Sequence, residues 1–357
     1  MLSRCGSLKF SFCLLIPVLL TGCLCHPQGR LEKHKGDEIV AAGKFFHTGT
    51  KVVLWMDPGG YDAYRVQRRF APIEDAEWEE SRPHMDSPRK PNRYGIRDRH
   101  LTDAEIERVR GGGWDLPLLQ SNVDQFVLHF DVAGVSRNCF KTLQDVRDLS
   151  VHFMLDLDGT IYQTLDLKEE AWHATTSNNR SIGIEIANLG SYGENAKDPL
   201  DSWYKKQPDG HVIIQIPSAV GPNPERTKNF VGRPARRQQV IGDVQGHPLH
   251  QYDFTPQQYK ALAKLTATLC SVFPKIKCDY PRDADGRLIT HKLPKEQLDK
   301  YEGVLGHYHV QTNKVDPGPA LQWDYVIGEA RRLMKERPQR NVNGEAIVFR
   351  PKLIVDN

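Results

Sequence analysis

The sequence has few cysteines, little net charge and few apolar residues, and each of these excludes a class of protein. Seven cysteines among 357 residues are too few for a disulfide-based scaffold. A formal charge of +3, from 48 basic and 45 acidic residues, is too small to argue for a nucleic-acid partner. With 39% hydrophobic and 26% charged residues, the chain has the composition of a soluble globular protein, not of a polytopic membrane protein or a largely disordered one.

One apolar run at the N-terminus departs from this pattern and is typical of a secretory signal. Arg4 and Lys9 precede an apolar stretch at 10–20, which is shorter than the ~20 residues that a membrane-spanning helix needs. The stretch ends in Leu-Thr-Gly-Cys, which resembles the bacterial lipobox, where cleavage precedes a cysteine that is then acylated. We therefore expect a signal peptide at 1–22, lipidation of Cys23 and a polar tether at 23–36. The alternative is a plain cleaved signal with a chance cysteine at its end.

Residues 37–117 are predicted to form a β-rich extension that contains a charged loop. The segments 38–42 and 51–55 have β-like patterns and flank residues with turn chemistry, which predicts one or two hairpins. Residues 74–99 are charged, contain three prolines and have few aliphatic side chains, so we expect a surface loop there.

The main domain is predicted at 118–334, followed by a tail at 335–357 without convincing structure. Strands are expected at 125–130, 151–157, 160–165, 181–186 and 304–310, and helices from Ser136, from Thr255-Pro256 and over 320–334. Ser136 is expected to cap the first of these helices, whose Phe140, Leu143 and Val146 would share one face. Asp158-Gly159 favours a two-residue turn between the strands at 151–157 and 160–165. The regular pattern lapses at about 191–252, which indicates a long insertion. Strands interleaved with helices predict an α/β domain around one sheet.

Polar residues at three places in the sequence could together hold a metal ion. His129 lies near the end of a short apolar strand, where a side chain can project into a cleft. His307 and His309 share a face if their segment is extended, and Asp316 follows in a turn fixed by Pro and Gly. Two imidazoles and a carboxylate with one open position are the ligand set of a catalytic zinc.

Several motifs occur in an order that resembles the type-2 zinc N-acetylmuramoyl-L-alanine amidases, the family that includes the peptidoglycan recognition proteins. The similarity covers about 122–334 and is carried by the segments 127–129, 156–163, 171–174, 179–185, 306–307 and 314–319. Several ordered motifs are far more specific than a single short pattern. The resemblance implies a mixed central β-sheet flanked by helices, with zinc in a groove on one side.

The resemblance also implies a role for each matching residue. His129, His307 and Asp316 would bind Zn²⁺, with water in the fourth position. Glu185 would accept the proton of the attacking water, and Lys314 would stabilise the developing oxyanion. The alternatives are that Glu185 is a hydrogen-bonded strand carboxylate and Lys314 a surface lysine.

Other matching positions are assigned to the substrate groove, and some depart from the family pattern. Trp172, His173, Asn179 and Arg180 are expected to bind substrate, although His173 could instead be a structural histidine under Trp172. His309 stands where relatives usually have Asp, so it stays an alternative metal ligand.

Four further residues are interpreted from the same comparison or from the expected compartment. His152 is expected to be structural, and Val151 replaces a tyrosine that some relatives carry, so that residue's catalytic role does not transfer. Cys270 and Cys278 flank a helix end in a compartment where disulfides persist, and a bridge between them is left open.

The insertion contains five basic residues, which either belong to a solvated loop or contact anionic wall polymer. These are Arg226, Lys228, Arg233, Arg236 and Arg237.

Taken together, the sequence predicts a monomeric, lipid-anchored amidase of the bacterial envelope. It would face the periplasm and cleave the amide between N-acetylmuramic acid and L-alanine in peptidoglycan or muropeptides, with no nucleic-acid partner. Leu24 after the acylated cysteine favours the outer over the inner membrane. Two rivals remain, a non-catalytic peptidoglycan-binding lipoprotein and a zinc peptidase that cuts within the stem peptide.

Overall fold

The computed structural model describes residues 34–65, 93–194, 196, 198–221, 226–334 and 351–356. The predicted signal peptide, Cys23 and most of the tether lie outside these residues, as does most of the charged loop. The described residues from Lys35 onward belong to one compact unit. No helix within the described ranges combines the length and apolar character needed to cross a membrane.

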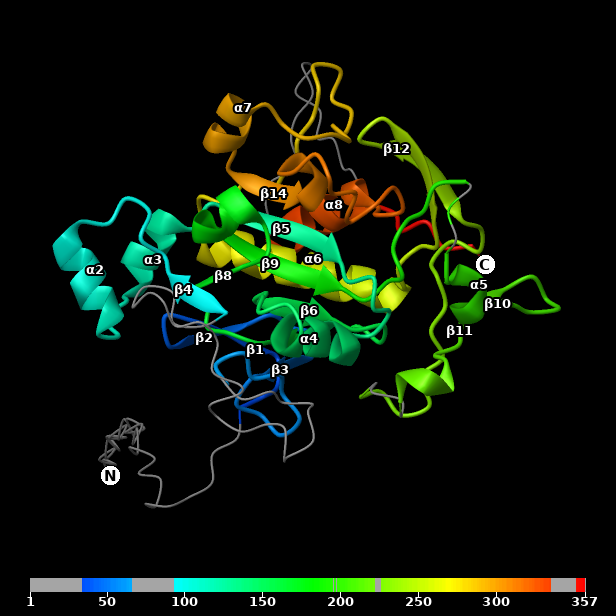
Figure 1. Ribbon diagram of the computed structural model, residues 1–357, viewed down its shortest axis with the longest axis horizontal. Helices are drawn as coiled ribbons and strands as arrows, with labels where there is room; N and C mark the ends of the chain where they lie inside the picture. The colour runs from blue at the N-terminus through cyan, green and yellow to red at the C-terminus, as the bar shows by residue number, and fades with distance from the viewer. Residues whose placement is uncertain are drawn as a thin grey trace, which may run out of the picture. The chain divides into compact units, whose positions relative to one another are not determined.

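A six-stranded mixed sheet forms the centre of this unit, in the order β14-β5-β9-β6-β7-β3 (Figure 1). The first four of these strands are parallel, β7 is antiparallel to β6, and β3 is parallel to β7. The bounds are β3 Val52–Leu54, β5 Gln125–Phe130, β6 Phe153–Leu155, β7 Ile161–Gln163, β9 Ser181–Ile186 and β14 Gly303–Gly306. The sheet confirms the predicted α/β class with a mixed central sheet.

Helices pack on both faces of the sheet. Helix α6 (Pro256–Val272) packs against α8 (Trp323–Leu333), and both share a core with apolar residues of β5 and β9. Helix α4 (Ser136–Asp145) covers the opposite face near Met154 and Tyr162. As predicted, α6 begins at Thr255-Pro256, where Thr255 and Gln258 form a capping box.

Alternation along β5 and β9 sorts side chains between the two faces. Phe126 and Leu128 belong to the core on the α6 side, so His129 points to the other face. On β9, Ile184 belongs to the same core and Glu185 points away from it. The sheet therefore directs its polar residues to the face opposite α6.

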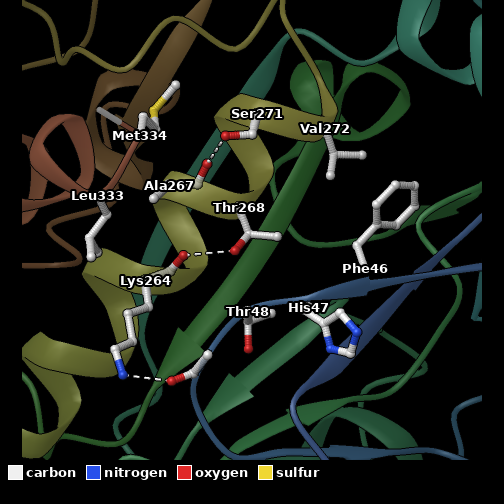
Figure 2. A pocket seen from close by; sticks show the side chains of 11 residues that line it. Phe46, His47, Thr48, Lys264, Ala267, Thr268, Ser271, Val272, Leu333 and Met334 are labelled. Carbon is white, nitrogen blue, oxygen red and sulfur yellow. Dashed lines mark hydrogen bonds between the residues drawn. The ribbon is translucent and has the colours of Figure 1, made fainter. Parts of the chain in front are cut away.

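The N-terminal extension is built into the domain. Strands β1 (Glu38–Ala41) and β2 (Lys44–His47) form a hairpin, but β2 lies in the segment expected to be a turn. The predicted strand at 51–55 becomes β3, which pairs with β7 at the edge of the central sheet. A cavity of about 460 Å³ lies between this hairpin and α6, where the Lys264 ammonium donates to the Gly49 carbonyl (Figure 2). It shares no lining residue with the site described below.

The end of the predicted charged loop is a strand. Strand β4 (Tyr94–Ile96) pairs with β8 (Glu169–Ala171), and helices α2 (Asp103–Arg110) and α3 (Leu116–Asn122) follow. The loop prediction is wrong here, because β4 contributes its backbone to a two-stranded sheet.

The predicted insertion contains regular structure in the described residues. It includes α5 (Leu200–Trp203), the hairpin of β10 (Tyr204–Lys206) and β11 (Val212–Ile214), η3 (Ser218–Val220), and the hairpin of β12 (Val240–Val244) and β13 (His247–Gln251). Its basic residues are partly used within the fold. Arg226 donates to the Pro58 carbonyl and Arg236 to the Asp253 carboxylate, so a purely solvated loop is the wrong description of these two.

Three local predictions are corrected by the structure. Only Gly159 of the Asp-Gly pair has positive φ, because Asp156 and Thr160 close a longer turn than the two-residue one. Ser136 is the first helical residue and caps nothing, since Val135 holds the N-cap position, and Val146 follows the helix and is exposed.

The C-terminal region differs from expectation at both ends. The predicted strand at 304–310 ends at Gly306 and continues as the 3-10 helix η4 (His307–His309), after α7 (Lys295–Lys300). Within the predicted tail, Asp356 accepts a hydrogen bond from the Arg237 amide, which attaches that residue to the domain. Cys270 and Cys278 are present as buried thiols, and no disulfide joins them.

Candidate metal centre and active site

Strand register brings residues from distant parts of the sequence into one row. His129 pairs with Glu185 across β5 and β9, and Leu128 pairs with Gly306 across β5 and β14. His307 directly follows Gly306 and so lies beside His129. Parallel strands thus place two imidazoles and a carboxyl at the same edge of the sheet.

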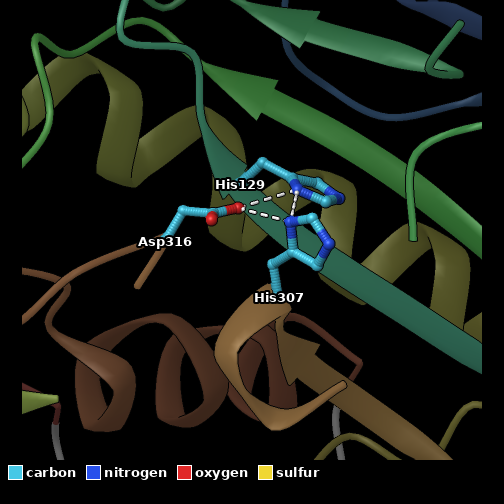
Figure 3. Close-up of side chains that lie close together, drawn as sticks. All are labelled: His129, His307 and Asp316. Carbon is cyan, nitrogen blue, oxygen red and sulfur yellow. Dashed lines mark hydrogen bonds and ion pairs between the residues drawn. The ribbon is translucent and has the colours of Figure 1, made fainter. Parts of the chain in front are cut away.

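Three ligand atoms converge at this edge (Figure 3). His129 Nδ1 lies 3.0 Å from His307 Nδ1 and 2.8 Å from Asp316 Oδ2, and His307 Nδ1 lies 2.9 Å from the same oxygen. All three residues are buried, and Asp316 comes from the loop after η4. One ion can contact all three atoms, so the predicted residues do meet.

The second nitrogen of each imidazole has its own partner. His307 Nε2 donates to Gln311 Oε1 at 2.5 Å. His129 Nε2 lies 3.0 Å from His173 Nδ1, and His173 Nε2 lies 3.2 Å from Ser181 Oγ. With protons on both Nε2 atoms, the Nδ1 lone pairs of His129 and His307 face the Asp316 oxygen, which is the state that binds a metal.

Burial and charge prepare these groups to bind a cation. Burial and then the neighbouring His307 lower the pKa of His129 to about 4, so its imidazole is neutral at neutral pH. Burial alone would raise the pKa of Asp316, but His307 and the hydrogen bonds with both imidazoles outweigh it and lower the pKa. The carboxylate is therefore ionised while His129 is not.

Glu185 lies next to His129 in the sheet, and one of its carboxyl oxygens has no hydrogen-bond partner. Its Oε2 is buried and has no hydrogen-bond partner. Burial, followed by the charges of Asp316 and Asp131, raises its pKa well above the ordinary value, and Lys314 and Arg147 oppose that rise. A buried carboxyl group with a raised pKa beside a cluster of possible metal ligands is typical of groups that transfer protons at active sites.

A cavity of about 80 Å³ opens beside the three ligand atoms. Lys314, Trp172, His173 and Glu185, four of the predicted site residues, line it. Arg147 also lines it and was not predicted, because an isolated arginine after a helix carries no sequence signal.

Two predicted substrate residues are used within the fold instead. Arg180 is buried and makes two hydrogen bonds to Asp124, at 2.5 and 2.6 Å. Asn179 donates to Asp98 and accepts from the Arg99 amide. Neither lines the cavity, so we assign both to the structure of the 3-10 helix η2 (Thr175–Arg180).

The structure excludes His309 as the alternative ligand. Its Nδ1 accepts from the Gly306 amide at 2.8 Å, and its Nε2 donates to the Ile289 carbonyl at 2.6 Å. Both nitrogens are therefore occupied. The expectation that it shares a face with His307 is wrong, because the segment is a 3-10 helix and not a strand.

His152 has the structural role that was predicted. Its neighbour Arg97 was not identified by sequence analysis. His152 is fully buried, and its Nδ1 accepts from the Gly183 amide at 3.1 Å. Arg97, also fully buried, lies 2.9 Å from His152 Nε2 and donates to the Ser181 carbonyl. Arg97 thus braces the strand beside His129, although it lies in a segment expected to be a loop.

The donor set fits a catalytic divalent metal. Two neutral imidazole nitrogens and one carboxylate oxygen leave one coordination position open in a tetrahedral site. Glu185, whose Oε2 has no hydrogen-bond partner, lines the cavity beside these three atoms.

The chain is similar to known proteins at the level of a sequence family. The sequence model described as N-acetylmuramoyl-L-alanine amidase matches residues 119–319. Among solved structures, AmpD is 16% identical, with 60% of this chain and 86% of that chain covered and a TM-score of 0.29. E. coli AmiD in complex with anhydro-N-acetylmuramic acid-L-Ala-D-γ-Glu-L-Lys is 18% identical, with 58% and 57% covered and a TM-score of 0.32. Curated protein sequences give no match.

Proposed function

The chain belongs to the N-acetylmuramoyl-L-alanine amidase family, and from that premise we propose that it hydrolyses the amide between N-acetylmuramic acid and L-alanine with the help of zinc. The observation that carries the proposal is the convergence of His129, His307 and Asp316 beside an unpaired Glu185 oxygen. A structural zinc site would be closed by a fourth protein ligand, which this cluster lacks among the described residues.

We assign separate roles in the hydrolysis to the metal ion and to two side chains. Zinc, when bound, acidifies a water molecule and supplies the nucleophile at neutral pH. Glu185 takes the proton of that water on Oε2 and returns it to the departing alanine nitrogen. Lys314 places an ammonium at the cavity, where it stabilises negative charge on the carbonyl oxygen during attack.

Charge at the cavity agrees with an anionic peptide substrate. Lys314 and Arg147 both line the cavity, and Trp172 offers an aromatic surface for a sugar or peptide. The AmiD ligand contains a γ-linked D-Glu, whose α-carboxylate stays free. We propose that the two cations attract such a carboxylate, which makes muropeptides or the stem of intact peptidoglycan the substrate.

The deciding experiment joins zinc analysis with product analysis. Purified protein should contain about one zinc per chain and should release L-alanine-terminated peptide from sacculi or anhydro-muropeptides, as measured by mass spectrometry. Zinc-loaded protein that binds wall but releases nothing would favour the peptidoglycan-binding alternative. Fragments cut within the stem peptide would favour the zinc peptidase.

Asp316→Ala tests the ligand set directly. Removal of the carboxylate leaves two imidazoles, so zinc content should fall to a small fraction and peptide release should be lost. Asp299→Ala, which removes an exposed carboxylate, is the control and should keep both. Full zinc content in Asp316→Ala would refute the assignment of this ligand.

We further propose that the protein acts as a monomer held in the bacterial envelope by acylated Cys23, on the periplasmic side. Leu24 supports the outer membrane in preference to the inner one. Wall polymer is then within reach of the anchored domain.

A further inference from the structure

The hairpin β12–β13, part of the predicted insertion, meets the loop that carries Lys314 and Asp316. Gln245 and Gly246 form its tip, with φ of 58° and 77°. Two consecutive positive φ values are those of a type I′ turn, which asparagine or glycine usually occupies. A glutamine at this position is unusual, so its side chain calls for an explanation.

The Gln245 amide bonds to the backbone on both sides of the cavity loop. Its Nε2 lies within donor distance of the Tyr308, Gln311 and Lys314 carbonyls, at 2.9, 2.8 and 3.2 Å. Its Oε1 accepts from the Lys292 amide at 3.2 Å. Tyr308 follows a metal ligand directly and Lys314 precedes Asp316 by two residues, so one amide spans the segment between two ligands.

A second glutamine of the same hairpin, Gln251, bonds to the backbone on the C-terminal side of Asp316. Gln251 is fully buried, accepts from the Ala320 amide at 3.0 Å and donates to the Pro317 carbonyl at 3.2 Å. At Gly318, an added Cβ would lie 2.2 Å from Gln251 Oε1, so the glycine permits this close approach.

We propose that the β12–β13 hairpin is a clamp that positions Asp316 and Lys314 opposite His129, with Gln245 and Gln251 as its positioning residues. The inference rests on the proposed function, since it concerns the same metal centre. It gives the insertion a role that neither its sequence nor its basic residues indicated. Hydrogen bonds that orient the ligands of a metal ion contribute to its affinity although they do not contact the ion. Removing such a hydrogen bond typically lowers metal affinity or activity by about 10- to 100-fold.

Gln245→Asn is the informative variant. Asparagine suits a type I′ turn before glycine, so the hairpin should form, but its amide is one methylene too short to reach the three carbonyls. Zinc affinity, measured by chelator competition, should fall about tenfold. The unfolding midpoint of the metal-free protein should stay close to that of the unmutated protein. Gln238→Asn, at an exposed glutamine of the same insertion, should change neither quantity.

A second variant and a spectroscopic readout complete the test. Gln245→Glu keeps the length but sets a carboxylate against three carbonyls, so its zinc affinity should also fall, and the absorption bands of the cobalt-substituted protein should shift in both variants. Unchanged zinc affinity in Gln245→Asn would overturn the clamp. So would an equal loss of affinity and metal-free stability, which would indicate a general structural role.

The proposed function is decided separately, by the unmutated protein. Unmutated protein that binds zinc but releases no peptide would refute amidase activity and leave the clamp standing. Active unmutated protein whose zinc affinity does not depend on Gln245 would refute the clamp alone.

Discussion

At the scale of single residues, the candidate site depends on the partner of each second imidazole nitrogen. His129 contacts His173 and His307 contacts Gln311, so neither ring is free to turn its Nδ1 away from Asp316. His173 was predicted to bind substrate, and it does line the cavity, but its hydrogen bond also orients a predicted ligand. A histidine in this position fixes the tautomer of its neighbour.

Glu185→Gln tests the assignment of the general base. Glutamine keeps the shape of the side chain but cannot accept the proton, so kcat should fall by about 10²- to 10⁴-fold. Zinc content should be unchanged, because Glu185 is not one of the three converging ligands. A glutamine variant with near-normal kcat and normal zinc would show that Glu185 is only a structural strand residue.

At the scale of elements, strand β9 supports the site through a glycine. A Cβ at Gly183 would lie 2.5 Å from His173 Nδ1, closer than real contacts allow. The Gly183 amide in turn donates to His152 Nδ1, and Arg97, the residue after β4, donates to the Ser181 carbonyl at the start of β9. The absence of a side chain at Gly183 therefore leaves room for the His173 ring beside His129.

Gly183→Ala should displace His173 without removing its imidazole. The clash should cost about 1–3 kcal/mol of unfolding free energy, and zinc affinity should fall as the His129 ring loses its partner. Both quantities follow from thermal unfolding and chelator competition.

Two variants control this prediction. Gly193→Ala adds a methyl group in open space and should have little effect. Combining Gly183→Ala with His173→Ala should restore most of the lost stability, because the clash is gone, but not the zinc affinity. If the double variant is as unstable as the sum of the single ones, the contact with His173 is not the cause.

At the scale of the whole molecule, buried carboxyl groups make stability depend on pH. Burial above all raises the pKa of Asp131 and of Asp156 to about 7. Each has one oxygen, Oδ2, that is buried without a partner. The folded state therefore binds protons more tightly than the unfolded chain between about pH 4 and 7, and stability falls as pH rises through this range.

Asp156→Asn should flatten this part of the pH profile. The difference between 3.8 and about 7 corresponds to at most about 4 kcal/mol, which the folded protein loses progressively between about pH 4 and pH 7. The variant should match the unmutated protein near pH 4 and be more stable at pH 8, as measured by denaturant unfolding. Parallel profiles for the two proteins would show that Asp156 does not titrate in this range.

Cys23→Ser tests the proposed attachment of the whole protein to a membrane. Serine lacks the thiol that is acylated, so the chain should stay uncleaved or become soluble, as followed by fractionation and by mass spectrometry of the N-terminus. Cys25→Ser is the control and should stay anchored. Unchanged membrane association in Cys23→Ser would refute the lipobox assignment.

Much of the fold could be predicted from local sequence patterns. Strands β5 and β9 match their predicted bounds, because short apolar runs between polar breaks have few alternatives. Helix α6 begins where Thr255 and Pro256 predict it, since capping is a local interaction. The candidate ligands His129, His307 and Asp316 were found through local spacing and ordered motifs.

Which side chains share the site could not be predicted from the sequence, because it depends on tertiary packing. The 3-10 turn at His307 sends His309 to the Ile289 carbonyl, and the ion pair with Asp124 removes Arg180 from the cavity. Arg147 and Gln245 reach the site across long stretches of sequence. A side chain's partners depend on the packing of elements that are distant in the chain, and local patterns carry no information about those distances.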